Sequence, residues 1–210
     1  MGELRATASE EKEARRRKIL EAAAELFRSW SIADITMDRI ADLAGIAKGT
    51  LYLYFRTKEA LFLSLFEQQL STWYSELEDL SSRVGGTVKP AVAAHVIAST
   101  LSARPILSRL HGLLHSSLGL NIDLDSVLDF RRRQRRRLTS LAPILAARID
   151  GLSESAAVRF LIRLEPVIGG LAWAAFPTPA LARALEEEDL EVFHVNFKNE
   201  LTEIVTALLT

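Results

Sequence analysis

The stretch that most constrains the fold of this chain runs from Ser31 to Phe62, where two short helical periods flank a glycine. Thr36 can begin the first helix, because its side-chain oxygen can accept a hydrogen bond from a free N–H of the first turn. Gly45 ends this helix, since glycine adopts the left-handed backbone conformation at little cost. A second helix, from about Ala47 to Tyr54, follows at once, and this spacing predicts a helix-turn-helix. The expected buried face of the first helix consists of Ile35, Ile40, Leu43 and Ala44.

The second helix combines a core anchor with side chains suited to nucleic acid. Leu51 and Phe55, spaced i, i+4, can hold it against a core. Gly49 leaves room for another backbone to approach closely, and Lys48 supplies charge for a phosphate. Hydroxyl and aromatic groups on the same helix can meet base edges and thymine methyl groups. Lys58 stands in the first turn of the next helix, where the helix dipole disfavours a cation, so we expect a phosphate beside it.

The order and spacing of these residues form a signature. From Thr36 to Leu61 the chain reads T-M-x-x-I-A-x-x-A-G-I-x-K-G-T-L-Y-x-Y-F-x-x-K-E-A-L, which resembles the DNA-binding motif of TetR-family transcriptional regulators. At Ala47 the chain lacks the Ser or Thr that the family often has, so a capping hydroxyl is absent. The resemblance and the residue types together predict contacts with a double-stranded DNA operator from Arg17, Thr36, Met37, Lys48, Gly49, Thr50, Tyr52, Tyr54 and Lys58.

The overall composition is that of a globular protein, with 49% hydrophobic and 25% charged residues and a net charge of −1. A near-neutral chain needs a local basic face to bind DNA, and Arg15 to Lys18 can either contribute to one or form a solvated face. No cysteine is present, no apolar run approaches the roughly 20 residues of a membrane helix, and the polar start is no secretory signal. We therefore expect a cytoplasmic protein without a membrane partner.

Helical periods continue through the rest of the chain without strand-like alternation, which predicts an all-α fold of about nine helices. We expect residues 1–60 to form a three-helix DNA-binding domain that begins with an amphipathic helix over Glu11 to Trp30. Residues 61–210 should form a larger helical ligand-binding and dimerisation domain. A long helix from Thr57 to about Leu80 would join the two domains.

The resemblance also implies a homodimer. In the family, two C-terminal helices of each subunit form a four-helix interface, and here these would be Ser153 to Phe176 and Leu185 to Leu209. Gly169 and Gly170 would let helix backbones approach closely. A two-fold dimer would place its recognition helices in successive major grooves, so the operator should be a near-palindrome.

Six arginines gather in the segment FRRRQRRRL, between Arg131 and Arg137. Three interpretations stay open for this run. It can be a solvated outer face, it can form ion pairs with acidic residues such as those in Glu186 to Asp189, or it can contact nucleic acid directly.

In the family, a small ligand binds among the middle helices of the second domain. The corresponding side chains here are largely apolar, which favours a hydrophobic effector. His111 and His115, spaced i, i+4, could share a metal ion, but no Cys or carboxylate motif completes such a site, so we expect neither metal nor cofactor. The pocket candidates, each of which can equally be a core residue, are Trp73, His95, Ile106, Leu110, His111, Phe130, Trp173 and Phe176.

Together these features predict a homodimeric transcriptional regulator, specifically a repressor that a small hydrophobic effector releases from a palindromic operator. We expect no enzymatic activity, because the sequence contains neither a nucleophile elbow nor a Gly-rich phosphate loop after a strand. The alternative is a helical ligand-binding or protein-interaction module in which the helix-turn-helix serves only as scaffold.

Overall fold

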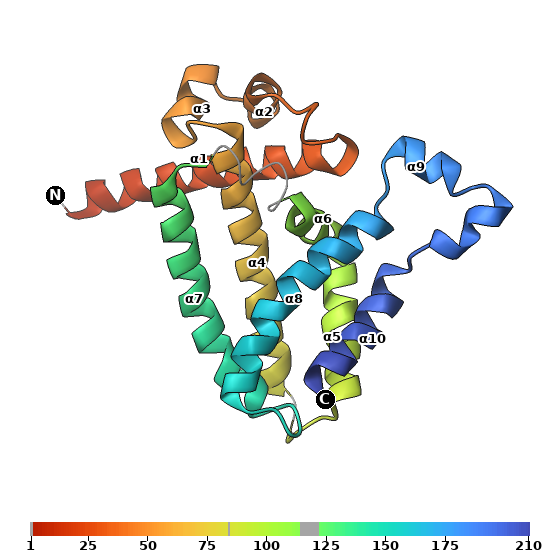
Figure 1. Cartoon of the computed structure of the whole chain (residues 1–210). Helices are drawn as coiled ribbons and strands as arrows, with labels where there is room; N and C mark the ends of the chain where they lie inside the picture. The colour runs from red at the N-terminus through yellow and green to blue at the C-terminus, as the bar shows by residue number, and fades with distance from the viewer. Residues whose placement is uncertain (1, 84, 114–121) are drawn as a thin grey trace. The chain divides into compact units, whose positions relative to one another are not determined.

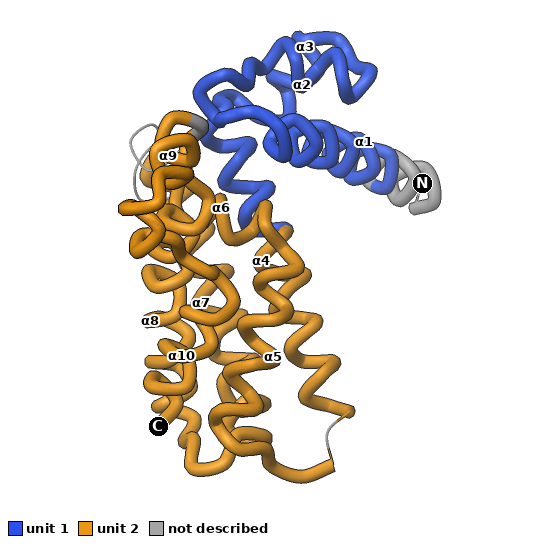
Figure 2. Tube along the Cα trace, turned by 90° about the vertical axis from the view of Figure 1, so that its right-hand side faces the viewer, with its two compact units in different colours: residues 1–68 blue, residues 69–210 orange. Residues whose placement is uncertain are grey.

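The computed structural model describes residues 2–83, 85–113 and 122–210. Within these ranges the chain is all-α, as predicted, with ten α-helices and a 3-10 helix. It divides into two compact units, residues 1–68 and 69–210 (Figure 2). The division falls inside a long helix, and the domain limits expected from the sequence, 1–60 and 61–210, stay a prediction.

The N-terminal unit is built around a small apolar core. Ile19 and Leu20 are fully buried, and the rings of Phe27 and Phe62 meet edge to face with their centroids 5.6 Å apart. The first helix begins at Gly2, earlier than the predicted Glu11, because most of the intervening residues tolerate a helix well. The helices of this unit are α1 (Gly2–Ser29), α2 (Met37–Ala44), α3 (Lys48–Tyr54) and the start of α4 (Lys58–Arg83) (Figure 1).

The buried face of α2 differs from the predicted one. Met37, Ile40 and Ala41 are buried, whereas Leu43 is exposed. The three buried residues share one side of the helix at spacings i, i+3 and i+4, which turns Leu43 outward. The prediction for Leu43 is therefore wrong, and Met37 takes its place in the core.

The C-terminal unit packs the rest of α4 with the remaining helices. Pro90 and Pro105 each occupy the first position of a helix, where their missing N–H costs nothing. In the described ranges no single helix meets the length and hydropathy of a membrane span, although α5 and α6, bent by 88°, meet them jointly. The helices are α5 (Pro90–Ser102), α6 (Pro105–Leu113), α7 (Leu124–Ala146), α8 (Glu154–Ala175), α9 (Pro179–Ala184), the 3-10 helix η2 (Glu188–Phe193) and α10 (Phe197–Leu209).

The predicted final helix, Leu185 to Leu209, is wrong in its first half. The Asn196 side chain accepts a hydrogen bond from the Asn199 N–H at 3.1 Å, and this cap starts α10 at Phe197. No residue of η2 is buried, so packing does not hold the preceding segment in a longer α-helix. The pair of helices expected to dimerise is therefore α8 and a shorter α10.

Gly169 allows a close helix approach within the chain. A Cβ atom on Gly169 would lie 3.2 Å from the His111 carbonyl oxygen of α6, and one on Gly112 would lie 3.2 Å from the Gly169 carbonyl oxygen. A Cβ atom on Gly170 would meet nothing within 4 Å. The close approach expected at this glycine pair is thus found at Gly169, with α6 of the same chain as the neighbour.

Two arginines of the run on α7 form ion pairs with glutamates on other helices. Arg131 Nη1 lies 3.7 Å from Glu165 Oε2, and Arg137 Nη1 lies 3.6 Å from Glu78 Oε1. These ion pairs use other acids than the predicted Glu186 to Asp189. The nucleic-acid interpretation of the run stays a prediction. The exposed arginines are Arg131, Arg132, Arg133, Arg135 and Arg136, whereas Arg137 is half-buried.

Candidate nucleic-acid interface

The turn between α2 and α3 has the predicted construction. Thr36 Oγ1 accepts a first-turn backbone N–H at 3.3 Å and caps α2. Gly45 follows the helix with a φ of 65°, and the Ile46 N–H donates to the Ala41 carbonyl at 3.0 Å. The left-handed Gly45 and this hydrogen bond together end α2 and set the start of α3. Ala47 provides no side-chain cap there, as the sequence indicates.

Two buried residues hold α3 and leave its other side open. Leu51 and Phe55 are buried, as predicted. A Cβ atom on Gly49 would meet nothing within 4 Å, so packing inside the chain does not require a glycine at this position. The exposed positions of α3 are Lys48, Gly49, Tyr52 and Leu53, while Thr50 and Tyr54 are half-buried.

Leu53 is absent from the predicted contacts, yet it is 84% exposed on α3. Helical geometry could have indicated this position. At about 100° per residue, Leu53 lies about 180° from the midpoint between Leu51 and Phe55, and so at the centre of the outward face.

Lys48 is already paired with an anion. Its Nζ lies 2.7 Å from Asp38 Oδ1 and 2.9 Å from Asp38 Oδ2, which links the start of α3 to the first turn of α2. The hydrogen bond from Lys48 to Asp38, together with the charge of that carboxylate, raises the pKa of the Lys48 ammonium. Both side chains are exposed. A phosphate that contacts Lys48 must therefore compete with Asp38.

Lys58 has two partners inside the N-terminal unit. Its Nζ donates to the carbonyl oxygens of Ile32 at 2.7 Å and Ile35 at 2.9 Å. These oxygens compensate the cation at the start of α4, a role that was predicted for a phosphate. Lys58 thereby fastens the connection between α1 and α2 to α4. Its contact with DNA stays a prediction.

The remaining predicted contacts occupy different environments. Arg17 and Thr36 are exposed. Met37 is only 8% exposed, so its side chain belongs to the core. Its contact with DNA stays a prediction, and its first-turn backbone N–H is the group suited to a phosphate.

Arg15 and Lys18 line a surface hollow of about 510 Å³ beside the helix-turn-helix. Gly45 and Thr50 lie on its other side, so the hollow joins cations of α1 to the turn and to α3. The basic run from Arg15 to Lys18 was noted in the sequence, but only Arg17 is among the predicted contacts. The i, i+3 spacing of Arg15 and Lys18, which places them on one face of α1, could have indicated this pair.

The predicted pocket residues do not form one interior set. His95, Trp173 and Phe176 lie at the surface of the C-terminal unit. An apolar hollow of about 160 Å³, lined by Leu77 and Val92 among others, contains none of the eight candidates. The effector pocket stays a prediction. The buried candidates are Trp73, Ile106, Leu110, His111 and Phe130.

The metal alternative pairs His111 with His115, and His115 lies outside the described residues. Among the residues that the structure does describe, no group of three or more His, Cys, Asp or Glu side chains is arranged to hold a metal ion.

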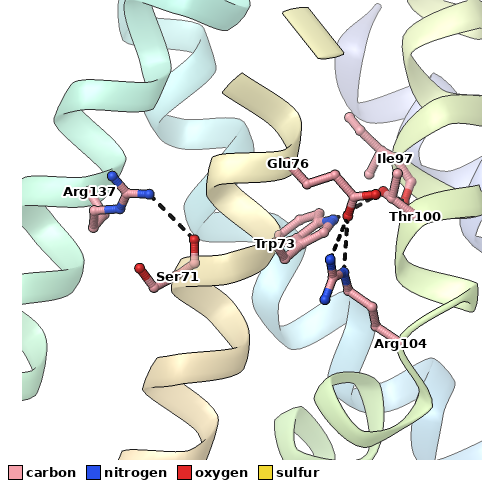
Figure 3. A network of polar contacts seen from close by, with 7 residues as sticks. All are labelled: Ser71, Trp73, Glu76, Ile97, Thr100, Arg104 and Arg137. Carbon is pink, nitrogen blue, oxygen red and sulfur yellow. Dashed lines mark hydrogen bonds and ion pairs between the residues drawn. The ribbon is translucent and has the colours of Figure 1, made fainter. Parts of the chain in front are cut away.

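Within the C-terminal unit, α4 has polar contacts with three neighbouring segments (Figure 3). They connect α4 to α5, to α7 and to the residue that precedes α6. The contacts are Trp73 Nε1 to Thr100 Oγ1 at 3.0 Å, Arg104 Nη2 to Glu76 Oε2 at 2.9 Å, and Arg137 Nη2 to the Ser71 carbonyl oxygen at 3.4 Å.

A buried carboxyl group joins α7 to α8. Gln134 Nε2 donates to Glu165 Oε1, and Arg131 Nη1 donates to Gln134 Oε1 at 2.7 Å. Burial raises the pKa of the Glu165 carboxyl, and the charge of Arg131 and the hydrogen bond from Gln134 act in the opposite direction. The group is therefore less stable as a carboxylate than an exposed glutamate.

Two family profiles match the chain. The profile described as tetracyclin repressor-like, C-terminal domain, covers residues 67–210, and that of bacterial regulatory proteins, tetR family, covers residues 19–65. A curated relative, the uncharacterised HTH-type transcriptional regulator YhgD of Bacillus subtilis, is 32% identical over 81 residues. That match spans 39% of each chain.

Solved structures with a similar fold cover nearly the whole chain. A TetR transcriptional regulator from a Rhodococcus species has a TM-score of 0.56 and 22% identity, over 95% of this chain and 97% of that one. FadR of Thermus thermophilus, a TetR-family repressor solved with lauroyl-CoA, has a TM-score of 0.58 and 21% identity over 92% of both chains. These likenesses establish the fold.

Proposed function

This chain belongs to the TetR family of bacterial regulatory proteins, and we propose that it is a homodimeric repressor that leaves its DNA operator when a hydrophobic effector binds. The observation that carries this proposal is the face of α3. Leu51 and Phe55 fix the helix, while Lys48, Gly49 and Tyr52 stay exposed. Such a regulator acts on the chromosome in the cytoplasm and needs no catalytic group.

We place α3 in the major groove, whose width admits an α-helix. Tyr52 and Thr50 would then contact base edges, and Leu53 would give an apolar contact to a thymine methyl group. Arg15 and Lys18 would neutralise phosphates beside the turn. These assignments are supported by exposure on α3 and by the hollow next to it, which Arg15 and Lys18 line together with Glu11.

Selection from a pool of random DNA duplexes tests the proposal. The purified protein is incubated with the pool at about 150 mM salt, and the bound duplexes are sequenced. We expect a near-palindrome with half-site centres about 10–10.5 base pairs apart, or a multiple of that distance. A folded protein that enriches no sequence would contradict the proposal and favour the scaffold alternative.

Dimerisation through α8 and α10 is supported by an apolar stripe on α8. Trp173 is 75% exposed and Ile162 is 54% exposed, and Pro166 and Gly170 lie between them on the same face. Apolar side chains gathered on one exposed face mark an interaction surface. Because α10 packs beside α8, the two helices can offer one continuous surface to a second copy.

A charge on this stripe tests the dimer. Ile162→Asp should convert the protein to monomers, because it would bury an unpaired carboxylate in the interface. Val92→Asp, at a similarly exposed position on α5, is the control and should leave the dimer intact. Sedimentation velocity distinguishes the two species, and a dimeric Ile162→Asp protein would contradict this interface.

Release by an effector needs a connection to α4, which runs from one unit into the other. The contacts of Glu76 with Arg104 and of Trp73 with Thr100 tie α4 to the segments around α5 and α6 (Figure 3). We place the effector among these helices. A ligand that binds more tightly to a conformation in which these contacts are shifted would increase the population of that conformation. The population of the DNA-bound protein would fall accordingly.

The buried Trp73, Leu110 and Phe130 favour an effector with an apolar body. FadR of Thermus thermophilus, which has a similar fold, was solved with lauroyl-CoA, a ligand with an apolar chain. Lauroyl-CoA is therefore the first probe to add to the protein–operator complex, with coenzyme A alone as the control. Release by the acylated compound alone supports a hydrophobic effector. Equal release by both compounds would contradict it.

A further inference from the structure

Between α8 and α10 the chain forms an exposed arm, residues 177–196, which contains α9 and η2. Figure 1 shows this arm extending away from the other helices of the C-terminal unit. Val192 is 81% exposed and Phe193 is 64% exposed. A hydrogen bond of 2.7 Å between His194 Nε2 and the Leu185 carbonyl oxygen closes the arm on itself. Large apolar side chains this exposed indicate that another molecule covers the arm.

The arm is also strongly acidic. It contains five acidic side chains and, apart from His194, a single basic one, Arg183. None of the five acids forms an ion pair among the described residues, and all of them are exposed. The acidic residues are Glu186, Glu187, Glu188, Asp189 and Glu191.

The outer face of α7 has the opposite charge. Arg132, Arg135 and Arg136 are exposed, because Gln134 and Leu138 turn the other side of the helix into the core. Arg132 meets only Asp129 on its own helix, at 3.5 Å, and the guanidinium groups of the other two have no ion pair among the described residues. Positive charges concentrated on one face favour an acidic partner.

A two-fold dimer would bring the arm and this face together. Figure 1 shows α7 and the arm on opposite sides of α8. The chain enters the C-terminal unit at one end of its helices, through α4, and both copies must turn that end toward the same duplex. The two-fold axis then runs along the helices. Rotation about it places the α7 side of one subunit opposite the arm side of the other. With α8 against α8, the arm of one subunit reaches the side that carries α7 of the other.

We propose that the arm of each subunit packs on α7 of the other subunit, with its acidic side chains against Arg132, Arg135 and Arg136. This inference rests on the proposed dimer through α8. The contact explains why Val192 and Phe193 are exposed in a single chain. It also gives the arginine run a partner of the kind that the sequence suggested, but on the second copy.

Two charge-reversal variants test the contact. The first is Arg132→Glu, Arg135→Glu and Arg136→Glu together, and the second is Glu187→Lys, Glu188→Lys and Asp189→Lys together. Each variant alone places like charges across both arm contacts, so its homodimer should dissociate about tenfold more readily at low salt. In a mixture, every arm of a heterodimer faces an opposite charge. Heterodimers should therefore exceed the statistical half of all dimers and approach about nine-tenths.

Native mass spectrometry of the mixture, with one variant isotope-labelled, measures the heterodimer share. If the arm instead paired with α7 of its own chain, each variant subunit would be destabilised to the same extent in homodimers and in heterodimers. The heterodimer share would then be statistical, and this result would overturn the proposal. Thermal unfolding of each variant, followed by circular dichroism, confirms that both are folded. Ile162→Asp distinguishes failure of the arm contact from failure of the α8 dimer. If it is monomeric while the charge variants mix statistically, the arm contact fails and the α8 dimer stands, whereas a dimeric Ile162→Asp protein removes the α8 dimer itself.

Discussion

Lys48 Nζ and Asp38 Oδ1 lie 2.7 Å apart, so the first residue of the recognition helix α3 is held by an acid in the first turn of α2. In the proposed complex Lys48 contacts a phosphate, and Asp38 then becomes a negative charge beside the DNA backbone. The pair thus favours the free protein over the complex, although it keeps the Lys48 side chain near the surface where DNA would bind.

Asp38→Asn should tighten DNA binding. The change removes the anion that competes with phosphate for Lys48, so affinity for any duplex should rise about two- to fivefold at low salt. Fluorescence anisotropy at several salt concentrations measures the effect. Asp42→Asn, also exposed on α2, is the matched control. Weaker binding by Asp38→Asn would mean instead that Asp38 is needed to position Lys48.

Gly49→Ala should separate stability from DNA binding. A Cβ atom at Gly49 meets nothing in the chain, so alanine should raise the free energy of unfolding by roughly 0.5–1 kcal/mol through its better helix propensity. The same methyl group would stand between α3 and the DNA, and operator affinity should fall about tenfold. Urea denaturation and anisotropy measure the two quantities. Unchanged operator affinity would show that DNA does not approach α3 at this residue.

Lys58→Met should act on stability. The change leaves the Ile32 and Ile35 carbonyl oxygens without their ammonium donor, which should lower the free energy of unfolding by about 1–3 kcal/mol. The salt dependence of DNA binding should stay close to that of the wild type, whereas Lys48→Met should reduce it. A stable Lys58→Met protein with a reduced salt dependence would instead support the contact between Lys58 and a phosphate that the sequence predicts.

Glu165→Gln should change how stability depends on pH. Burial raises the pKa of Glu165, and a carboxyl whose pKa is raised on folding contributes stability at low pH that is lost as pH rises from 4.5 through the raised value. Glutamine does not ionise, so the variant should gain stability relative to the wild type as the pH rises above about 4.5. Urea denaturation at each pH measures this difference, with Glu203→Gln, exposed on α10, as the control. A difference independent of pH would contradict it.

The turn of the helix-turn-helix and the anchor of α3 were predictable because their signals are local. The Thr36 cap, the left-handed Gly45 and the buried Leu51 each depend on a few neighbouring positions. Helical spacing also predicted most of the exposed residues of α3. It would have predicted Leu53 as well if it had been applied to every position of the helix.

Features that depend on distant neighbours were not predictable in this way. The carbonyl partners of Lys58 come from the connection between α1 and α2, and the tight neighbour of Gly169 comes from α6. Leu190, Phe193 and Phe197 keep helical spacing and so predicted one helix through the arm, but only Phe197 is buried. Without a packed neighbour, that periodicity does not fix a long helix.

In the proposed complex, a two-fold dimer reads two half-sites with two copies of α3. The most direct measurement compares affinity for the selected operator with affinity for the same operator after ~5 base pairs, about half a helical turn, are inserted between its half-sites. A dimer of this kind should lose about 10³-fold in affinity and approach non-specific binding, because one half-site has turned to the far side of the duplex. Equal affinity for the two duplexes would contradict this mode of binding, since each subunit would then be binding DNA on its own.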